Sequence, residues 1–452
     1  MSQLAGYGRP FWLDLERPRF PQLETNLTTD IVIVGAGISG LKLAHALAQR
    51  GLSSVILEGA QVGEGASGRN QGTICVGANS TYAEAIAAFR PSCGTEARRF
   101  ARDLWQLGVV NLELIKKQLA ELEVRCDFQP EGFYQLVRRD SDGWEDQLSH
   151  YQDDVRLMID DGLQAECLDR DTAVARGGNE LYMGGLGYPQ DCQFHSGKYV
   201  IGLAQGVCRS CHVRLFEQTR VLHMKPAGKG VDVITSRGTV SARHVFLLTN
   251  ALVPQHIPAL TDATRAERGQ VLVTEPLAER PCRGSFGTTQ AWWREIPEAD
   301  GRFRLLFGGG RKRNEPDSLF RQFDGDGKPH PKLESEGFSP SEAHQQRLDV
   351  QFRALFPQLA SARITHRWGG LQSFTADGLP LVGAFDPDRP IHGMAGFCGR
   401  GNTYSNVGAE FLAARVEGVK SIVEQQYGPL FDRLMAVNRP SARWPAWETP
   451  NA

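Results

Sequence analysis

The stretch Asp30-Ile-Val-Ile-Val34-Gly35-Ala-Gly37-Ile-Ser-Gly40 joins a run of β-branched residues to three glycines spaced as G-x-G-x-x-G. Such a run is typical of a buried parallel strand. Apolar residues recur at helical spacing over residues 39–50, and Ser54-Val-Ile-Leu57 predicts a second buried strand. These three segments predict a βαβ unit with a right-handed crossover.

Each glycine of this motif has an expected structural task. Gly35 permits a tight turn, Gly37 lets the backbone approach a pyrophosphate, and Gly40 lets the helix pack closely on the strand. The start of the helix offers free N–H groups and a partial positive charge to phosphates. Glu58 ends the second strand, where an acidic side chain can accept hydrogen bonds from ribose hydroxyls. A glycine turn without a ligand is the alternative, but the agreement of these features favours a dinucleotide site.

The number of such units indicates which dinucleotide is bound. The chain has one strand–GxGxxG–helix unit. An enzyme that binds both FAD and NAD(P) usually needs two units. A single unit near the N-terminus therefore favours FAD alone, with electrons supplied by a small-molecule substrate.

Composition narrows the class of protein. The chain has 452 residues, of which 41% are hydrophobic and 23% charged, with a net charge of −2. These values disfavour a disordered chain and a nucleic-acid binder. The longest apolar stretch, residues 31–48, is interrupted by three glycines and contains Lys42 and His45, so we expect no transmembrane segment. The first residues lack a basic start followed by an apolar core, so we expect no secretory signal and a cytoplasmic protein.

The number of cysteines also favours the cytoplasm. Nine cysteines, an odd number, in a chain without an export signal indicate reduced thiols. Cys208 and Cys211 form a CxxC pair, for which a redox or zinc role is the alternative interpretation. Because no second pair accompanies it, we expect a helix end that leads into a strand at residues 212–216, and no metal site.

The remaining sequence predicts two interleaved domains. We expect helices at residues 96–122, 144–161, 196–206, 341–356 and 410–425, strands at 132–138, 231–235, 244–249, 270–274 and 303–307, and a long polar loop at 311–337. The expected fold class is α/β, with a Rossmann-like FAD-binding domain and an interleaved α+β substrate domain built on an antiparallel sheet. The expected boundaries are residues 1–80, 143–255 and 365–430 for the FAD-binding domain, 81–142 and 256–364 for the substrate domain, and 431–452 for a C-terminal tail.

Five further segments, most of them rich in glycine, follow the βαβ unit. They are Gly63-Glu-Gly-Ala-Ser-Gly68-Arg69-Asn70-Gln-Gly72, Val245-Phe-Leu-Leu-Thr249-Asn250-Ala251, Trp368-Gly-Gly370-Leu, Thr375-Ala-Asp377-Gly-Leu-Pro380-Leu-Val-Gly383 and Gly396-Phe-Cys-Gly399-Arg-Gly401-Asn402. In this order they resemble the flavin-contacting segments of the D-amino acid oxidase superfamily, which includes glycine oxidase and sarcosine oxidase. Residues 302–310, RFRLLFGGG, resemble the γ-glutamylputrescine oxidase branch in particular.

The resemblance implies a set of FAD-binding positions. They are Gly35, Gly37, Ile38, Ser39, Gly40, Glu58, Gly59, Ser67, Arg69, Asn70, Gly72, Val221, Thr249, Asn250, Gly370, Gly399, Gly401 and Asn402. The helix expected to begin near Asn402 would direct its positive end at the flavin N1–C2=O edge and stabilise the reduced anionic flavin. A glycine-rich turn without a ligand at that position, and a surface salt bridge for Arg69, are the alternatives.

The mode of FAD attachment is also an expectation from the resemblance. Some relatives attach the flavin covalently to a cysteine or a histidine. Neither residue type stands at Arg69-Asn70 or between Gly370 and Thr375. We therefore expect non-covalent FAD.

The resemblance further implies the reaction. Hydride passes from the C–H bond beside the nitrogen of an amine or amino acid to flavin N5, and the resulting imine hydrolyses. A substrate carboxylate calls for an arginine, which binds it with two hydrogen bonds. Trp293, Arg294 and Arg400 are the candidate catalytic residues, and Trp292 is a second candidate wall of an apolar slot. The alternatives are a tryptophan buried in the core and an Arg294 that faces solvent.

The electron acceptor and two other functions stay open. Some oxidases of this superfamily use a lysine on the strand that matches residues 303–307 to activate oxygen, whereas this strand has Arg304 and no lysine. Oxygen and a quinone or carrier both remain as acceptors. The alternative functions are an FAD-dependent dehydrogenase of a hydroxy acid or polyol, and a flavin-bound sensor or assembly protein without catalysis.

Overall fold

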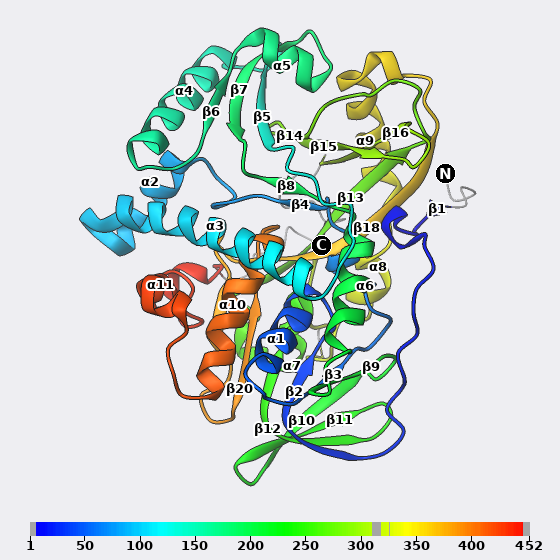
Figure 1. The fold of residues 1–452 in the computed structure, drawn as a ribbon, viewed down its shortest axis with the longest axis vertical. Helices are drawn as coiled ribbons and strands as arrows, with labels where there is room; N and C mark the ends of the chain where they lie inside the picture. Colours follow the sequence, from blue (N-terminus) through cyan, green and yellow to red (C-terminus); the bar gives the residue numbers. More distant parts are fainter. Residues whose placement is uncertain (1–5, 310–317, 325, 446–452) are drawn as a thin grey trace.

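The computed structural model describes residues 6–309, 318–324 and 326–445. Within these ranges the chain forms an eight-stranded sheet, a ten-stranded sheet and a small two-stranded sheet. Figure 1 shows the smaller of the two large sheets, with β2, β3 and β12, in the lower part of the molecule, and the larger sheet above it. The predicted α/β fold with a second, largely antiparallel sheet is confirmed.

The smaller sheet contains the predicted βαβ unit. Its strands are β2 (Leu27–Val34), β3 (Ser54–Leu57), β9 (Val213–Phe216), β10 (Val221–Ala227), β11 (Gly230–Thr235), β12 (Thr239–Leu247), β19 (Leu381–Ala384) and β20 (Ile391–Ala395). The order is β10-β11-β12-β2-β3-β9, with β20 beside β12 and β19 beside β20. Strand β2 runs parallel to both β3 and β12. Helix α1 (Ile38–Ala48) lies between α6 (Ser196–Val207) and α10 (Gly401–Val416) in Figure 1, as the crossover helix of this unit.

The larger sheet extends away from this unit. Its strands are β1 (Gly6–Tyr7), β5 (Phe133–Arg138), β6 (Glu166–Leu168), β7 (Tyr182–Tyr188), β13 (Arg265–Thr274), β14 (Ser285–Gly287), β15 (Ala291–Pro297), β16 (Phe303–Gly309), β17 (Leu319–Phe320) and β18 (Ile364–Phe374). The order is β1-β18-β13-β16-β15-β14-β5-β7-β6, with β17 on β13, and all pairs except β1–β18 and β14–β5 are antiparallel. Two short strands, β4 (Thr73–Ile74) and β8 (Cys192–Gln193), pair with each other.

The other helices cover the larger sheet or buttress the smaller one. They are α2 (Tyr82–Cys93), α3 (Ala97–Glu121), α4 (Trp144–Asp160), α5 (Arg170–Gly177), α7 (Val253–His256), α8 (Pro331–Gly337), α9 (Glu342–Leu355) and α11 (Ile422–Arg433). Helices α4 and α5 pack on β7, and α9 packs on β13 and β16. Helix α3 packs on α10, so it supports the helix layer of the smaller sheet. No helix in the described part of the chain is long and apolar enough to cross a bilayer.

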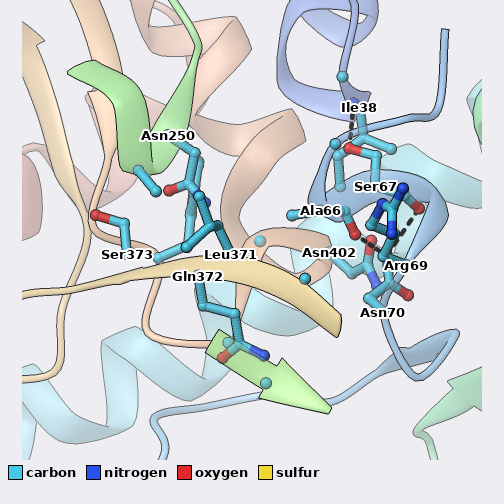
Figure 2. A pocket seen from close by; sticks show the side chains of 18 of the residues that line it. Ile38, Ala66, Ser67, Arg69, Asn70, Asn250, Leu371, Gln372, Ser373 and Asn402 are labelled. Atoms are coloured by element: carbon cyan, nitrogen blue, oxygen red, sulfur yellow. Dashed lines mark hydrogen bonds between the residues drawn. The ribbon is translucent and has the colours of Figure 1, made fainter. Parts of the chain in front are cut away.

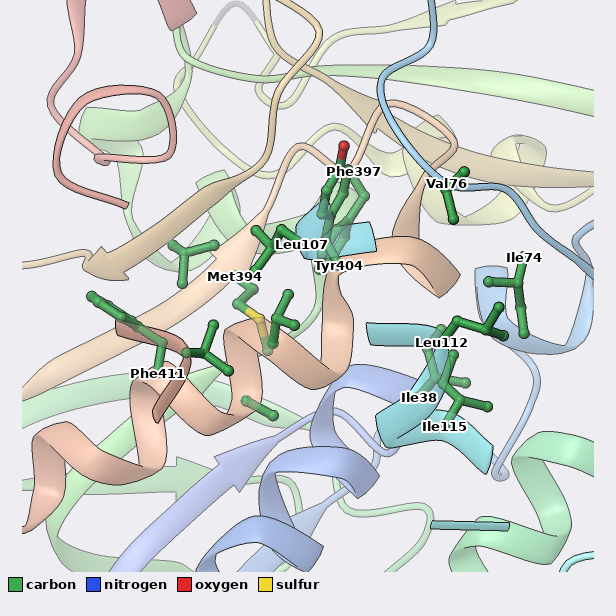
Figure 3. Close-up of a cluster of buried hydrophobic side chains, with 14 of the residues drawn as sticks. Ile38, Ile74, Val76, Leu107, Leu112, Ile115, Met394, Phe397, Tyr404 and Phe411 are labelled. Carbon is green, nitrogen blue, oxygen red and sulfur yellow. The ribbon is translucent and has the colours of Figure 1, made fainter. Parts of the chain in front are cut away.

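A continuous apolar core fixes the position of α1 against its neighbours. Figure 3 shows Ile38 of α1, Leu107, Leu112 and Ile115 of α3, and Tyr404 of α10 in one cluster. Ile38 is the first residue of α1 and is only 5% exposed. Because burial of such side chains stabilises the fold by about 1.5–3 kcal/mol each, this cluster holds the start of α1 in place.

Several details differ from the sequence predictions. A single helix over residues 410–425 is wrong, because α10 ends at Val416, Gly418 adopts a positive φ of 67°, and Ser421 caps a separate helix, α11. The expected loop at residues 311–337 contains β17 and α8, while residues 310–317 and 325 lie outside the described part. Helix α8 begins at Pro331 after the capping residue His330, a helix start that the polar composition concealed.

Four strands of the larger sheet fall within the ranges expected for the FAD-binding domain. Strand β1 lies within residues 1–80, β6 and β7 lie within 143–255, and β18 lies largely within 365–430. The expected start of the tail at residue 431 lies inside α11. Arg439 beyond it is buried and binds Asp377 through two hydrogen bonds of 2.6 and 2.8 Å. The segment up to residue 445 therefore packs on the protein, and the division into domains stays a prediction.

Candidate functional site

A cavity of about 910 Å³ lies where the two large sheets approach each other. The smaller sheet contributes the ends of β2 and β3, together with the turn that follows β12. The larger sheet contributes residues of β5, β13, β15, β16 and β18. In an open α/β sheet, ligands bind beyond the carboxyl ends of the strands. The cavity therefore occupies the position that the sequence predicts for the dinucleotide.

Most of the residues predicted to bind the cofactor line this cavity. They are Gly35, Gly37, Ile38, Ser39, Glu58, Gly59, Ser67, Arg69, Asn70, Val221, Thr249, Asn250, Gly370, Gly399, Gly401 and Asn402, and the candidate catalytic residue Arg400 lines it as well. Gly40, Gly72, Trp293 and Arg294 are outside its lining. The structure thus brings together segments that are more than 300 residues apart in the sequence.

The glycine motif forms the turn that its spacing predicts. Gly35 has a φ of 105°, and a Cβ there would lie 2.9 Å from the carbonyl oxygen of Leu248. Gly37 is the N-cap of α1. A Cβ on Gly40 would lie 2.0 Å from the carbonyl oxygen of Gly35. Gly40 therefore permits close packing of helix on strand, while Gly35 and Gly37 face the cavity.

Glu58 lies at the end of β3, where its carboxylate joins two backbone turns. It accepts hydrogen bonds from the N–H groups of Ala36 (2.8 Å) and Ala60 (2.9 Å), one on each oxygen. Burial raises the pKa of the Glu58 carboxyl, and the two N–H donors oppose this rise. Each oxygen retains accepting capacity, as a partner for ribose hydroxyls requires.

The segment around Ser67 lies against the start of α1. The Ser67 hydroxyl accepts a hydrogen bond from the Ile38 N–H at 3.0 Å, and Asn70 donates its side-chain amide to the carbonyls of Ala66 (3.1 Å) and Ser67 (2.9 Å). Figure 2 shows these residues on one wall of the cavity, with Asn250, Gln372 and Ser373 on the facing side. The Arg69 guanidinium donates to the carbonyls of Glu64, Phe338 and Gly369, so it links β18 to this segment instead of forming a surface salt bridge alone.

Helix α10 begins at the cavity wall. Gly399 precedes it with a φ of 82°, and Arg400 is its N-cap. The Asn402 amide donates to the Thr73 carbonyl at 3.0 Å, and the Asn402 carbonyl accepts from the Asn111 amide at 2.8 Å. These contacts fix the first turn at the edge of the cavity, where the leading N–H groups of a helix lack partners four residues back; the Thr403 N–H donates to the Arg400 carbonyl at 2.9 Å.

Buried polar atoms test whether the cavity suits a flavin dinucleotide. Among the described residues, the side-chain oxygens of Thr249, Asn250, Ser373 and Asn402 have no hydrogen-bond partner, although all four residues line the cavity. Buried polar groups are normally paired. A planar ring system with several acceptors and donors on its edge, together with a pyrophosphate at the start of α1, would satisfy such a lining. The residues present therefore fit FAD.

The side chain of Trp293 points away from the cavity. It is fully buried (0% exposed) and stacks with Tyr182, Phe286 and Phe307 at centroid distances of 6.0, 5.7 and 6.4 Å. Its neighbour Trp292 lines the cavity. Because successive side chains of a strand point to opposite faces, one tryptophan faces the core of the larger sheet. The position of Trp293 removes it as a candidate for contact with the substrate.

Arg294 likewise serves the backbone. Its guanidinium donates to the carbonyls of Gly72 (2.6 Å), Phe194 (2.9 Å) and Glu295 (3.0 Å). Burial lowers the pKa of Arg294 to about 10. Arg294 is therefore not available to bind a substrate carboxylate. Gly72 does not line the cavity as predicted; its carbonyl accepts a hydrogen bond from Arg294.

Arg400 differs from the other arginines of the cavity. Arg69 is held by backbone carbonyls and Glu64, and Arg220 by Glu334. The chain forms no ion pair to Arg400 among the described residues, and the thiol of Cys75 is its polar side-chain neighbour. A partly exposed guanidinium that forms no ion pair with a described carboxylate therefore lies on the cavity wall.

The sequence interpretation missed several lining residues in the segment after β4, in strands β5, β13 and β18, and between β14 and β15. They are Cys75, Asn79, Gln135, Gln270, Thr288, Thr289, Gln290 and Gln372. Polar residues within a predicted strand give no sign of which face they occupy until the partner strand is known. No group of three or more metal-ligating side chains is arranged around a common point in the described ranges.

Comparisons with known proteins agree with this geometry. The sequence model of the family described as FAD dependent oxidoreductase (DAO) matches residues 30–415. The γ-glutamylputrescine oxidoreductase of Escherichia coli (strain K12) is 26% identical over 411 residues, which cover 88% of this chain and 86% of that protein.

Solved structures show the same fold. The glycine oxidase of Geobacillus kaustophilus has a TM-score of 0.68 at 19% identity, covering 88% of this chain and 96% of that one. The L-proline dehydrogenase of P. horikoshii has a TM-score of 0.67 at 18% identity, covering 91% of this chain and all of that one (100%). The family match covers most of the chain, so this protein is an enzyme of the FAD dependent oxidoreductase (DAO) family.

Proposed function

We propose that this enzyme oxidises the carbon–nitrogen bond of an amine that carries a carboxylate, an amino acid in the broad sense. The observation that carries the proposal is Arg400, the cavity arginine that neither a carboxylate nor a set of backbone carbonyls holds within the described chain. Arginine binds a carboxylate with two hydrogen bonds, and a low-dielectric cavity strengthens such a contact. Arg400 would anchor the substrate acid group.

The chain's own residues would bind and orient the substrate. Trp292 offers an apolar wall, and the amides of Gln135 and Gln270 offer neutral hydrogen-bond partners in the same part of the cavity. Burial disfavours a charged amine, so the cavity would hold the amine in the neutral form whose lone pair assists loss of hydride. FAD, when bound, supplies the hydride acceptor at N5. The imine product hydrolyses in water.

The same lining favours an amine over a hydroxy acid. A hydroxyl group needs a base to take its proton as hydride leaves, whereas a neutral amine does not. The described cavity residues include no lysine, and their carboxylates are Glu58, Glu64 and Glu334, each already hydrogen-bonded. His256, which also lines the cavity, lies near Arg220 and Glu334, and burial lowers its pKa to about 4. Among the described lining residues beside Trp292, the cavity therefore offers a place for an amine and no general base for an alcohol.

Non-covalent binding of FAD is part of the proposal. Two cysteines line the cavity, Cys75 and Cys398. Burial raises the pKa of Cys398 to about 11, and burial also raises the pKa of Cys75. A thiol that stays protonated is a poor nucleophile, so neither would attach to the flavin ring. Acid precipitation of the holoenzyme should release all of the yellow colour into the supernatant, and colour retained in the pellet would contradict this.

We propose that a quinone or an electron carrier, in preference to oxygen, accepts the electrons from the reduced flavin. Arg304 replaces the lysine of some oxidases, and it points away from the cavity: it binds Glu298 and donates to the Thr274 carbonyl at 3.0 Å. Stopped-flow reoxidation of the reduced enzyme tests this. A quinone should reoxidise the flavin faster than dissolved oxygen does.

Anaerobic bleaching of the flavin tests the substrate class. The holoenzyme would be mixed without oxygen with a panel of amines, N-methyl and D-amino acids, γ-glutamylated polyamines and hydroxy acids. We expect loss of the flavin absorbance with a carboxylate-bearing amine and none with hydroxy acids. The variant R400Q should lose this response, while R302Q, an exposed arginine paired with Asp300, should keep it. Bleaching by hydroxy acids alone would replace the proposal with the alcohol dehydrogenase alternative.

A further inference from the structure

An acidic side chain that no mechanism above uses lies behind the cavity wall. Asp191 follows β7 and is 0% exposed. One of its carboxyl oxygens accepts the N–H of Val76 at 3.1 Å, and the other has no hydrogen-bond partner in the described part of the chain. The thiol of Cys75, which lines the cavity and precedes Val76 in the chain, interacts with both Asp191 and Arg400. Asp191 itself is not part of the cavity lining, so the Cys75 thiol is the neighbour that Asp191 shares with the cavity residue Arg400.

The environment of Asp191 disfavours its charge. An ionised carboxylate with one hydrogen bond and no exposure to solvent loses most of its hydration without compensation. Burial accordingly raises the pKa of Asp191 to about 8, although Val76, Arg400 and Cys75 each oppose the rise. Near neutral pH the carboxyl therefore carries its proton.

Other groups around Asp191 contribute little charge. Burial raises the pKa of the Cys75, Cys192 and Tyr188 side chains, so all three stay neutral at physiological pH. Tyr134 is a more distant neighbour whose pKa burial also raises. Among the described groups that act on Arg400, the remaining ones are Tyr404, which is likewise held neutral, and Asp191 itself. Asp154 acts on Tyr188 and is not among them. Within the described ranges, Asp191 is thus the neighbour of Arg400 whose charge can change near physiological pH.

We propose that Asp191 is a positioning residue that determines how strongly Arg400 binds an anion in the cavity. An uncharged Asp191 leaves the guanidinium of Arg400 free for the anion of the substrate. An ionised Asp191 attracts that guanidinium through the Cys75 thiol and weakens its hold on the anion. The inference rests on the proposed role of Arg400 and adds a second residue that tunes substrate binding.

Binding of benzoate to the holoenzyme tests this inference. Benzoate is an anion throughout the relevant range and cannot donate hydride, so a change in flavin absorbance reports binding alone. We expect the dissociation constant of the wild type to rise at least about tenfold between about pH 6.5 and about pH 9.5, across the ionisation of Asp191. The variant D191N, which keeps the shape without the charge, should bind benzoate with the same constant at both pH values. R400Q should bind weakly at both.

Several outcomes would overturn the inference. They are a wild-type dissociation constant that is independent of pH, a pH dependence that D191N retains, and binding that R400Q does not weaken. If D191N fails to fold, a wild type without pH dependence still overturns the inference, and C75S, which replaces the thiol by a hydroxyl, is the second variant: it should alter the size of the pH effect, and an unaltered effect would contradict the inference. If amino acids bleach the flavin but the benzoate affinity of the holoenzyme is the same with and without the Asp191 carboxylate, this inference alone is refuted. Flavin that no amine bleaches would refute the proposed function.

Discussion

Glu334 and Arg220 form an ion pair of two hydrogen bonds, each 2.7 Å long, at one end of the cavity. Glu334 belongs to α8, which packs on β17 and β18 of the larger sheet, and Arg220 immediately precedes β10 of the smaller sheet. Both residues line the cavity on the side of Glu58 and Val221. The pair therefore joins the two halves of the molecule across the position proposed for the adenosine part of FAD.

The first prediction concerns release of FAD. The change Glu334→Gln removes the charge of this pair, so FAD should dissociate faster. Because the pair is partly exposed, the effect should be modest, about two- to fivefold, and should shrink at high salt. Dissociation can be followed by the flavin fluorescence that appears on release. Glu336→Gln is the matched control on the same helix, since Glu336 pairs with Lys332 and does not line the cavity. If both changes accelerated FAD release equally, the Arg220–Glu334 ion pair would have no specific role in retaining FAD.

The second prediction concerns Arg400. Its replacement by glutamine should lower kcat/KM for a carboxylate-bearing amine by about 10- to 100-fold, the usual loss for a charge-assisted hydrogen bond. Replacement by lysine should restore part of this loss, because the charge remains but the two-bond geometry does not. Steady-state kinetics with both variants provide the measurement. If R400Q had an unchanged kcat/KM, Arg400 would not bind the substrate carboxylate.

The third prediction concerns Gly40. A methyl group at this position would meet the carbonyl oxygen of Gly35 at 2.0 Å, so Gly40→Ala should push α1 away from β2. We expect a loss of stability of about 1–3 kcal/mol, typical of overpacking, and weaker FAD binding. Gly65→Ala is the control for stability, measured without FAD because Gly65 lines the cavity, since nothing in the protein lies within 4 Å of its added methyl group. Thermal unfolding and FAD content measure both effects. A G40A protein as stable as G65A would show that the helix does not need this close approach.

The fourth prediction concerns the dependence of stability on pH. Lys42 on α1 is 1% exposed, donates to the Ser405 hydroxyl at 2.9 Å, and burial lowers its pKa to about 7 from a value of 10.5. The unfolded chain therefore binds an extra proton between these two values, which destabilises the fold most below about pH 7 and less as pH rises. The free energy of unfolding of the wild type should increase by about 1–2 kcal/mol from about pH 7 to about pH 9 relative to K42M. Urea titrations at the two pH values measure it, and a constant difference between the proteins would contradict it.

The sequence predicted the parts of the site that depend on local spacing. The glycine motif specifies its own turn, because a Cβ at Gly35 or Gly40 would collide with the backbone. Arg400 was found because it stands between Gly399 and Gly401, whose motif marks the start of a helix. In both cases residues close in sequence determine the local geometry.

Long-range pairing explains what the sequence did not predict. Whether Trp292 or Trp293 faces the cavity depends on which side of β15 the cavity lies, and only the pairing of β15 with β14 and β16 settles that. Gln135 faces the cavity for the same reason, because β5 joins β14 in a parallel pair. Nothing in the sequence indicated that Asp191 is buried, because its burial depends on the folded chain around it. Register and burial are properties of the folded chain and not of a short segment.

The most direct measurement compares two substrates that differ only in the acid group. The holoenzyme is titrated without oxygen with an N-methyl amino acid and, separately, with the same amine that lacks the carboxylate. The account predicts that the first bleaches the flavin and that the second does so far more weakly, with the difference largely lost in R400Q. Equal bleaching by both compounds in the wild type, or a flavin that neither this pair nor any other carboxylate-bearing amine reduces, would contradict the claim that Arg400 anchors the substrate.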